Sequence, residues 1–323
     1  MEPKLKQGFR SWLPWLALVT VWIVWGSTYL GIQVAIETMP PLLMAGFRFI
    51  IAGAVMFAIV GRRHATGVHR LTVPQLRSTA IIGTLMLAGG NGGVSFGETT
   101  VDSGLAALIV ATVPVWMVLI NAFATKTRVT ASMILALALG TIGVGILVGG
   151  PGSTVDTTGA VIVLVASICW ATGSVYARRA PLPAHPLVTA SLEMLAGGLV
   201  LVAAGAVAGE FGRLDVTAIS SASLAGFLWL VVAGSMIAFT AYGYANATLP
   251  NDTVATYAYV NPVVAVALGA LFAQEVLSAN LLIGGAVIVG AVVLIVAGRA
   301  LSRRLRGRAA LKDASRQEPE RVA

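Results

Sequence analysis

Charge is scarce in this sequence, and that scarcity limits the class of protein. Only 11% of the 323 residues are charged and 57% are hydrophobic, whereas about 25% of the residues in soluble domains are charged. Segments of about ten residues with alternating polarity are also missing, which excludes a transmembrane β-barrel. The 36 glycines fit membrane helices instead, because small residues let such helices approach closely.

Cysteine and histidine are nearly missing as well. The single cysteine, Cys169, excludes an internal disulfide and any multi-cysteine metal site. The metalloprotease H-E-x-x-H and the phosphate-binding P-loop patterns do not occur, so metal-dependent hydrolysis and ATP-driven pumping have no sequence support. A G-x-S-x-G pattern at 93–97 lies near the outer face, whereas His64, His69 and His185 lie in inner connections, so no hydrolase triad forms. We therefore expect no enzyme, no metal and no cofactor.

Hydrophobic runs of about 20 residues, the length that crosses ~30 Å of hydrocarbon, recur along the whole chain. They predict an all-α integral membrane protein with ten transmembrane helices near 13–35, 41–60, 78–97, 104–124, 131–149, 158–177, 187–208, 222–246, 253–273 and 279–298. The connections are too short for a soluble domain. The first run is too long, and is followed by too many others, for a cleaved signal peptide.

The basic residues predict the orientation of these spans. With the N-terminus in the cytoplasm, Arg213 lies outside, Arg48 lies within a span, and the other 19 of the 21 basic residues lie inside. The outer connections carry the acidic residues Glu37, Glu98, Asp102, Asp156, Glu210, Asp215 and Glu275. The positive-inside rule therefore gives N-in and C-in. The formal charge of +8 follows from this topology and does not indicate nucleic-acid binding.

The two halves of the chain repeat one another at an offset of about 145 residues. Residues 25–28 (WGST) match 170–173 (WATG), Arg48 matches Glu193, and Pro114 matches Pro262. Because each half has five spans, the second half enters the membrane inverted, an architecture typical of secondary transporters. The predicted parts are a cytoplasmic segment 1–12, repeats 13–149 and 150–298, and a basic, disordered cytoplasmic tail 299–323. The tail anchors the orientation or binds anionic lipid or a partner.

The residues that carry this repeat resemble a known family. The segments 25–29 (WGSTY), 40–48 with Arg48, and 106–114 are similar to the first repeat of EamA-type transporters, and 170–176, 257–262 (YAYVNP) and 275–285 are similar to the second. This family belongs to the drug/metabolite transporter superfamily, and the resemblance is closest to YedA-like bacterial inner-membrane exporters. It implies ten helices in two inverted repeats and efflux of amino acids, related metabolites or drugs. One departure is Lys126-Thr127, where many members have an acid.

Arg48 and Glu193 are the two strong charges well inside predicted spans. Such charges are costly, so they serve transport or are paired to orient helices. Arg48 lies about 10 Å from the outer face and Glu193 about 10 Å from the inner face, so a direct ion pair is not expected. Glu193 is the predicted proton carrier, because burial disfavours its ionised form.

Polar and helix-breaking residues within the spans predict a solute cavity. Gly89-Gly90-Asn91-Gly92-Gly93 predicts an unwound stretch whose backbone and Asn91 amide bind solute, with close helix packing as the alternative. Pro114 and Pro262 predict kinks in equivalent spans and, with Arg48 and Glu193, form the predicted gating set. The predicted cavity residues are Trp25, Ser27, Asn91, Trp116, Trp170, Ser174, Tyr257, Tyr259 and Asn261. Tyrosines near span ends also serve as interface anchors.

These features predict a secondary transporter that exports small metabolites by alternating access. An importer or antiporter of similar solutes would have the same signature, and a passive channel is the alternative from another class. The expected partners are a small-molecule substrate, the lipid bilayer and a coupled proton, with no nucleic acid. Small-residue pairs at Gly145 and Gly149 and at Ala286 and Gly290 fit either a homodimer face or packing within the monomer.

Overall fold

The computed structural model describes residues 3–63, 71–126, 131–149 and 155–294, and all regular structure within these ranges is helical. Seven helices are long and apolar enough to cross a membrane: Trp12–Ile36, Pro41–Val60, Val73–Gly97, Ser103–Thr125, Thr157–Ala177, Pro186–Val207 and Ser221–Ala245. Three shorter apolar helices follow the remaining predicted runs, at Ile134–Gly149, Tyr257–Phe272 and Ala279–Leu294. The predicted basic tail lies outside the described residues.

The first half of the chain contains two spans that are divided into shorter elements. Its elements are α1 (Pro3–Ile36), α2 (Pro41–Arg63), α4 (Val73–Ile82), the π-helix η1 (Gly83–Gly92), α5 (Gly93–Gly97), α6 (Ser103–Val110), α7 (Val113–Thr125) and α8 (Ala131–Gly149). The span at 73–97 joins α4, η1 and α5. The span at 103–125 breaks between α6 and α7, where Pro114 lies in the first turn of α7.

The second half has a corresponding order of elements. They are α9 (Thr157–Ala177), α10 (Pro186–Val207), the short 3₁₀ turns η2 (Glu210–Gly212) and η3 (Val216–Ala218), α11 (Ser221–Trp229), the π-helix η4 (Leu230–Ile237), α12 (Ala238–Thr248), α13 (Asn251–Val254) and α14 (Tyr257–Phe272). The last described helix, Ala279–Leu294, follows α14. Each half therefore has a π-helix in its third span.

Local sequence explains where several helices begin. Thr72 and Gln75 form a reciprocal capping box, with Thr72 Oγ1 accepting from the Gln75 N–H and Gln75 Oε1 accepting from the Thr72 N–H. Asp156 accepts hydrogen bonds from the N–H groups of Thr158 at 2.7 Å and Gly159 at 3.3 Å and so caps α9.

The prediction of an unwound stretch at 89–93 is wrong. The chain remains helical there, with π-helical winding in η1 and α-helical winding in α5. Packing explains why the glycines do not break the helix. Both η1 and α5 pack against α9, and η1 also packs against α10. A Cβ on Gly90 would contact the Trp170 ring at 3.0 Å and one on Gly93 would contact Ala166 at 2.8 Å, so the glycines allow this close approach.

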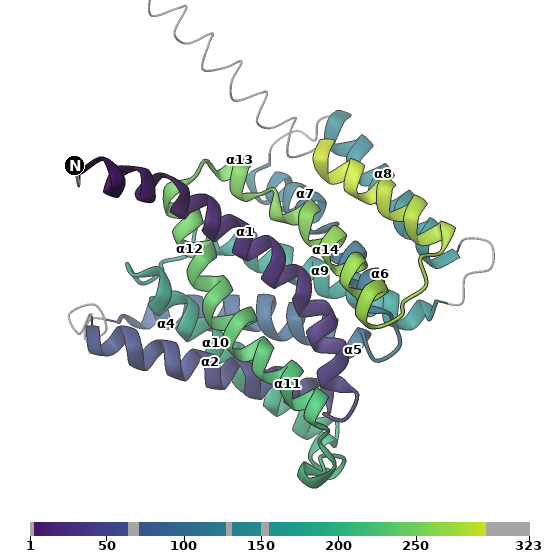
Figure 1. The fold of residues 1–323 in the computed structure, drawn as a ribbon, viewed down its shortest axis with the longest axis horizontal. Coiled ribbons are helices and arrows are strands. Elements are labelled where there is room, and N and C mark those ends of the chain that lie inside the picture. The colour runs from purple at the N-terminus through teal and green to yellow at the C-terminus, as the bar shows by residue number, and fades with distance from the viewer. Residues whose placement is uncertain (1–2, 64–70, 127–130, 150–154, 295–323) are drawn as a thin grey trace, which may run out of the picture.

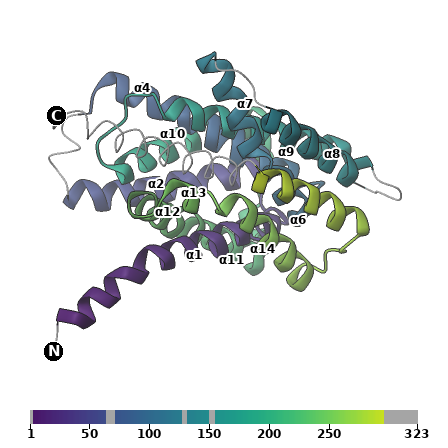
Figure 2. The same ribbon diagram turned by 90° about the horizontal axis from the view of Figure 1, so that it is seen from above.

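The two halves of the chain are interleaved rather than placed side by side. Helix α2 packs extensively against α10, and α1 packs against α11, α12 and α14. In the same way α9 packs against α4, η1, α5, α6 and α7. Figure 1 shows α1 crossing the molecule, with α2, α10 and α11 together on one side of it. In Figure 2 the N-terminal turns of α1 extend beyond the rest of the bundle.

Helix α8 and the last helix, Ala279–Leu294, form an edge of the bundle away from α2 and α10 (Figure 1). They cross at glycines, since a Cβ on Gly143 would lie 2.9 Å from the Gly284 carbonyl oxygen. Added Cβ atoms at Gly145, Gly149 and Gly290 would meet nothing within 4 Å. These last three positions therefore face away from the described part of the chain.

Two acidic residues predicted in outer connections hold helix starts of the other half. Glu210 is fully buried and accepts the N–H groups of Leu42 at 3.3 Å and Leu43 at 2.9 Å, in the first turn of α2. Glu275 accepts the N–H groups of Ser103 and Gly104 at the start of α6. Both carboxylates satisfy helix N–H groups that have no partner within the helix. These contacts tie the two halves together at one end of the bundle.

Candidate transport cavity

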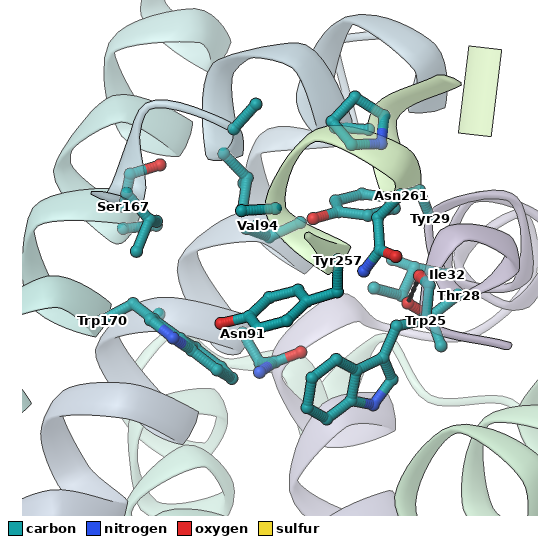
Figure 3. Close-up of a pocket in the computed structure, with 18 of the residues that line it drawn as sticks. Trp25, Thr28, Tyr29, Ile32, Asn91, Val94, Ser167, Trp170, Tyr257 and Asn261 are labelled. Carbon is teal, nitrogen blue, oxygen red and sulfur yellow. Dashed lines mark hydrogen bonds between the residues drawn. The ribbon is translucent and has the colours of Figure 1, made fainter. Parts of the chain in front are cut away.

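A cavity of about 100 Å³ lies between the two halves of the chain (Figure 3). Its lining comes from α1, α2, η1, α5, α6, α7, α9, α12 and α14, which are elements of both halves. Most lining side chains are aliphatic or aromatic, and a few are polar, which is the usual composition of a small-molecule site. The polar lining residues are Thr28, Tyr29, Arg48, Asn91, Ser167, Tyr257 and Asn261.

An aromatic cluster forms one wall of the cavity. The Trp25 ring centroid lies 5.0 Å from that of Tyr242 and 5.4 Å from those of Phe239 and Tyr257. Trp25 Nε1 donates a hydrogen bond to the Gly234 carbonyl at 3.2 Å. The ring is therefore fixed by contacts to α12, α14 and η4, and this wall joins α1 of the first half to three elements of the second.

Two amides and a second tryptophan line other parts of the cavity. Asn91 comes from η1 and Trp170 from α9, and Figure 3 shows both beside the Tyr257 side chain. Asn261 is buried in α14, and its amide nitrogen, oriented to donate, lies 3.2 Å from the carbonyl oxygens of Trp22 and Tyr257. Asn91 supplies both a donor and an acceptor, so it suits a polar group of a solute.

Arg48 brings a buried cation to the same cavity. Its side chain is 2% exposed, and its Nε donates to Ser235 Oγ in η4 at 2.9 Å. Its Nη1 is buried and makes no hydrogen bond to any described residue. An added Cβ on Gly234 would lie 2.9 Å from Thr28 Cγ2 and 3.1 Å from Nη2, so the glycine allows both side chains to pack closely against η4. The π-helix η1 thus lines the cavity through Asn91, whereas η4 holds two lining side chains, Arg48 through Ser235 and Trp25 through the Gly234 carbonyl.

The structure brings together only part of the predicted set. Trp25, Arg48, Asn91, Pro114, Trp170, Tyr257, Asn261 and Pro262 all line the cavity. The predicted residues that lie elsewhere are Ser27, Trp116, Ser174, Glu193 and Tyr259. Ser27 Oγ accepts from Trp229 Nε1 at 3.0 Å, and Trp116 Nε1 donates to Thr112 Oγ1 at 3.1 Å. Glu193 is partly buried on α10, where its backbone packs against Gly83.

Several lining residues carried no separate signal in the sequence analysis. Thr28 and Tyr29 belong to the repeat motif that begins at Trp25, so membership of this motif is the sequence feature that could have identified them as lining residues. Ser167 precedes Trp170 by three residues on α9, and residues three apart share one face of a helix. Val94 and Ile32 are aliphatic residues in aliphatic runs, and nothing in such a pattern separates a cavity wall from the core.

The sequence matches the EamA-like transporter family over residues 12–149 and again over 157–297. The chain belongs to this family. Like other EamA-like proteins it is a membrane transporter, and its several apolar helices make it a multi-pass membrane protein.

Individual relatives agree with the EamA-like assignment. The uncharacterized inner membrane transporter YedA of Escherichia coli K12 is 41% identical over 302 residues, covering 91% of this chain and 94% of the relative. A probable amino-acid metabolite efflux pump of Salmonella typhimurium LT2 is 26% identical, covering 93% and 98%. A probable terminal-alkyne amino-acid exporter of Streptantibioticus cattleyicolor is 28% identical, covering 90% and 95%.

A solved protein structure also shares the fold of this EamA-like chain. The two superpose with a TM-score of 0.60 at 20% sequence identity, covering 87% of this chain and 96% of the other. A likeness at this identity indicates the fold alone, because one fold supports many activities.

Proposed function

We propose that the chain is a secondary transporter of the bacterial inner membrane that exports amino acids or related small metabolites by alternating access. It has ten spans in two inverted repeats, 13–149 and 150–298, with both termini in the cytoplasm. The observation that carries this proposal is the cavity, which lies between interleaved halves and is lined by both. A site at the junction of two repeats becomes accessible from either side when one part rocks against the other.

The size and lining of the cavity favour a small solute. Its volume of about 100 Å³ is below the roughly 300–1,000 Å³ of pockets that hold drug-sized ligands. Asn91 and Arg48 offer a polar amide and a cation, which suit the charged or polar groups of an amino acid. Two relatives named as exporters of amino acids or their metabolites support the same substrate class.

Two further distinctions are tested separately: the direction of transport, and whether the protein is a carrier or a channel. An importer or antiporter would use the same cavity. A channel would offer a continuous pore, whereas alternating access predicts a site that only one side reaches at a time. Exchange of labelled for unlabelled solute in proteoliposomes separates these two classes, because a saturable exchange is expected of a carrier and not of a pore.

The first experiment compares metabolites in the medium of cells that overproduce the wild type or Asn91→Leu. Leucine keeps the size of the side chain but removes its donor and acceptor. We expect an amino acid or related solute to accumulate outside with the wild type, and export to fall about tenfold or more with the variant, which corresponds to about one lost hydrogen bond.

Thr20→Val serves as the matched control. Thr20 is a partly buried residue of α1 outside the cavity lining, and its hydroxyl donates to the Leu16 carbonyl of its own helix, so its replacement removes a polar group without altering the cavity. It should export at the wild-type rate at matched membrane expression. Equal media from wild type and Asn91→Leu would contradict the exporter proposal, and uptake in proteoliposomes would then decide between an importer and a channel.

A further inference from the structure

Glu98 is a buried carboxylate whose two oxygen atoms have no hydrogen-bond partner among the residues that the structure describes. The residue follows the span Val73–Gly97 directly, and its side chain is 4% exposed. Both Oε1 and Oε2 are buried, and within the described ranges neither accepts a hydrogen bond. An ionised carboxylate in that position is costly, since burial without hydrogen bonds removes the water that stabilises the charge. The buried acid Glu210 and the acid Glu275 differ, because each accepts hydrogen bonds from backbone N–H groups.

Charged and titratable groups from three other segments interact with Glu98. Arg48 of α2 and Glu275 of the loop after α14 interact electrostatically with its carboxyl, and Tyr29 of α1 is a further neighbour. Asp156, which precedes α9, interacts with Thr100, two residues further along the chain. Arg48 and Tyr29 also line the cavity, so Glu98 lies immediately behind the cavity wall.

We propose that Glu98 is a proton-binding site that links protonation to closure of the outer end of the transporter. In the closed state the carboxyl is buried, neutral and free of hydrogen bonds, and Arg48 is the cation that interacts with it. When the outer end opens, water reaches the carboxyl, which releases its proton and becomes ionised. The inference rests on the proposed function, because it adds the residue that couples transport to protons.

The direction of this coupling follows from the surroundings of the carboxyl. Burial raises the pKa of Glu98 well above its ordinary value, Glu275 raises it further, and Arg48 lowers it. A state that raises the pKa binds the proton more tightly, so acidic conditions favour the closed outer end. As pH rises through the pKa that Glu98 has in the closed state, proton binding no longer stabilises that state and the population of the open state increases.

Glu193 is the competing candidate for the proton site. It is partly buried, does not line the cavity, and lies on α10, where its backbone packs against Gly83. Glu98 has the stronger geometric case because its oxygens are fully enclosed and because two of its electrostatic neighbours belong to the cavity wall. Replacing each acid by glutamine removes the titration while keeping the shape.

The test measures the conformation of the outer end and needs no transported solute. Spin labels are placed at Phe211→Cys and Val276→Cys, two exposed positions beyond the ends of α10 and α14, in a Cys169→Ala background. Distances between the labels are measured in nanodiscs between roughly pH 5 and pH 9, a range that covers the ordinary and the raised pKa of a carboxyl. The wild type should shift from short to long distances as pH rises.

Three variants decide the outcome. Glu98→Gln should keep the short distances at every pH, whereas Glu193→Gln should shift as the wild type does. Arg48→Gln should move the midpoint upward by about one unit or more, because it removes the cation that favours ionised Glu98. A purely structural role for Arg48 would not move the midpoint.

Two results would overturn the inference: a wild type whose distances ignore pH, or a Glu98→Gln variant that still responds. A response lost in Glu193→Gln instead would place the proton site there. Solute exchange in proteoliposomes is scored separately, so a failed proton link with intact exchange leaves the transporter proposal standing.

Discussion

Glu275 caps the helix that begins at Ser103, although the two residues lie 172 positions apart. Glu275 Oε1 accepts a hydrogen bond from the Ser103 N–H at 2.9 Å, and Oε2 accepts one from the Gly104 N–H at 3.0 Å. The first N–H groups of a helix have no partner in the helix, and the positive end of its dipole favours a carboxylate. The loop after α14 is thereby fastened to the start of α6.

Removal of this cap should destabilise the protein. We expect Glu275→Ala to lower the free energy of unfolding by about 1–3 kcal/mol, because it removes the acceptor of the Gly104 N–H and leaves the Ser103 N–H with Gln33 Oε1 as its acceptor, and Glu275→Gln to have a smaller effect. Thermal unfolding in detergent measures the change. Glu37→Gln, at an exposed acid on the same side, is the control. Identical midpoints for Glu275→Ala and the wild type would show that the cap contributes nothing.

Gly269 of α14 leaves the space that the Glu275 carboxylate occupies. An added Cβ on Gly269 would clash with the Glu275 carboxylate oxygens. Gly269→Ala should therefore displace the carboxylate and destabilise the protein, whereas Gly243→Ala should not, because its Cβ would meet nothing within 4 Å. If the clash acts through the cap, the double variant Gly269→Ala/Glu275→Ala should be less destabilised than the sum of the single ones. Strict additivity would mean that the two changes act independently.

The contacts of the acidic residues at span ends could not be predicted from the sequence. Glu98, Glu210 and Glu275 are all short distances from apolar runs, and the sequence predicted only that they lie in outer connections. One is buried without a partner and two cap helices of the other half. These differences depend on packing between segments far apart in the chain, which a single sequence does not record.

The sequence predicted those cavity residues that stand at matching positions of the two repeats. Trp25 and Trp170 stand at matching positions and both line the cavity. Tyr257 and Tyr259 look equivalent in the sequence, yet only Tyr257 lines the cavity. Residues two apart in a helix with 3.6 residues per turn point in nearly opposite directions, so one of the two had to face away. The pattern alone does not indicate which one.

Asp156 makes the start of α9 sensitive to acid. Hydrogen bonds from the backbone N–H groups of Thr158 and Gly159 lower the pKa of this exposed carboxyl below its ordinary value. Because its pKa is lower in the folded protein than in the unfolded chain, the ionised Asp156 carboxylate stabilises the fold. This stabilisation is complete above the pKa of the unfolded chain, about 3.9, and is lost as pH falls through the pKa of the folded protein.

Hydrogen exchange in the first turn of α9 tests this effect. Protection should be lower at about pH 3 than at about pH 6 in the wild type, after correction for the intrinsic exchange rate. Asp156→Asn should remove the pH dependence, because asparagine is also a good cap but does not titrate. An equal change in both proteins would assign the acid sensitivity to another group.

The crossing of η1 and α10 depends on two glycines. A Cβ on Gly83 would clash with the Glu193 carbonyl oxygen, and one on Gly197 would lie 2.6 Å from the Gly83 carbonyl oxygen. Both obstacles are backbone atoms, which do not move aside as the end of a side chain does. Gly83→Ala should therefore push the helices apart and cost about 1–3 kcal/mol of stability.

Gly145→Ala, in the apolar helix α8, provides the comparison, because an added Cβ there meets no described atom within 4 Å. It should leave the monomer as stable as the wild type, or slightly more stable, since alanine is the better helix former. Cross-linking in membranes tests the remaining role of this position. If Gly145 lies in a homodimer face, a bulky Gly145→Leu should abolish dimers without lowering the unfolding midpoint of the monomer. Dimers that persist in Gly145→Leu would place any dimer contact on another face.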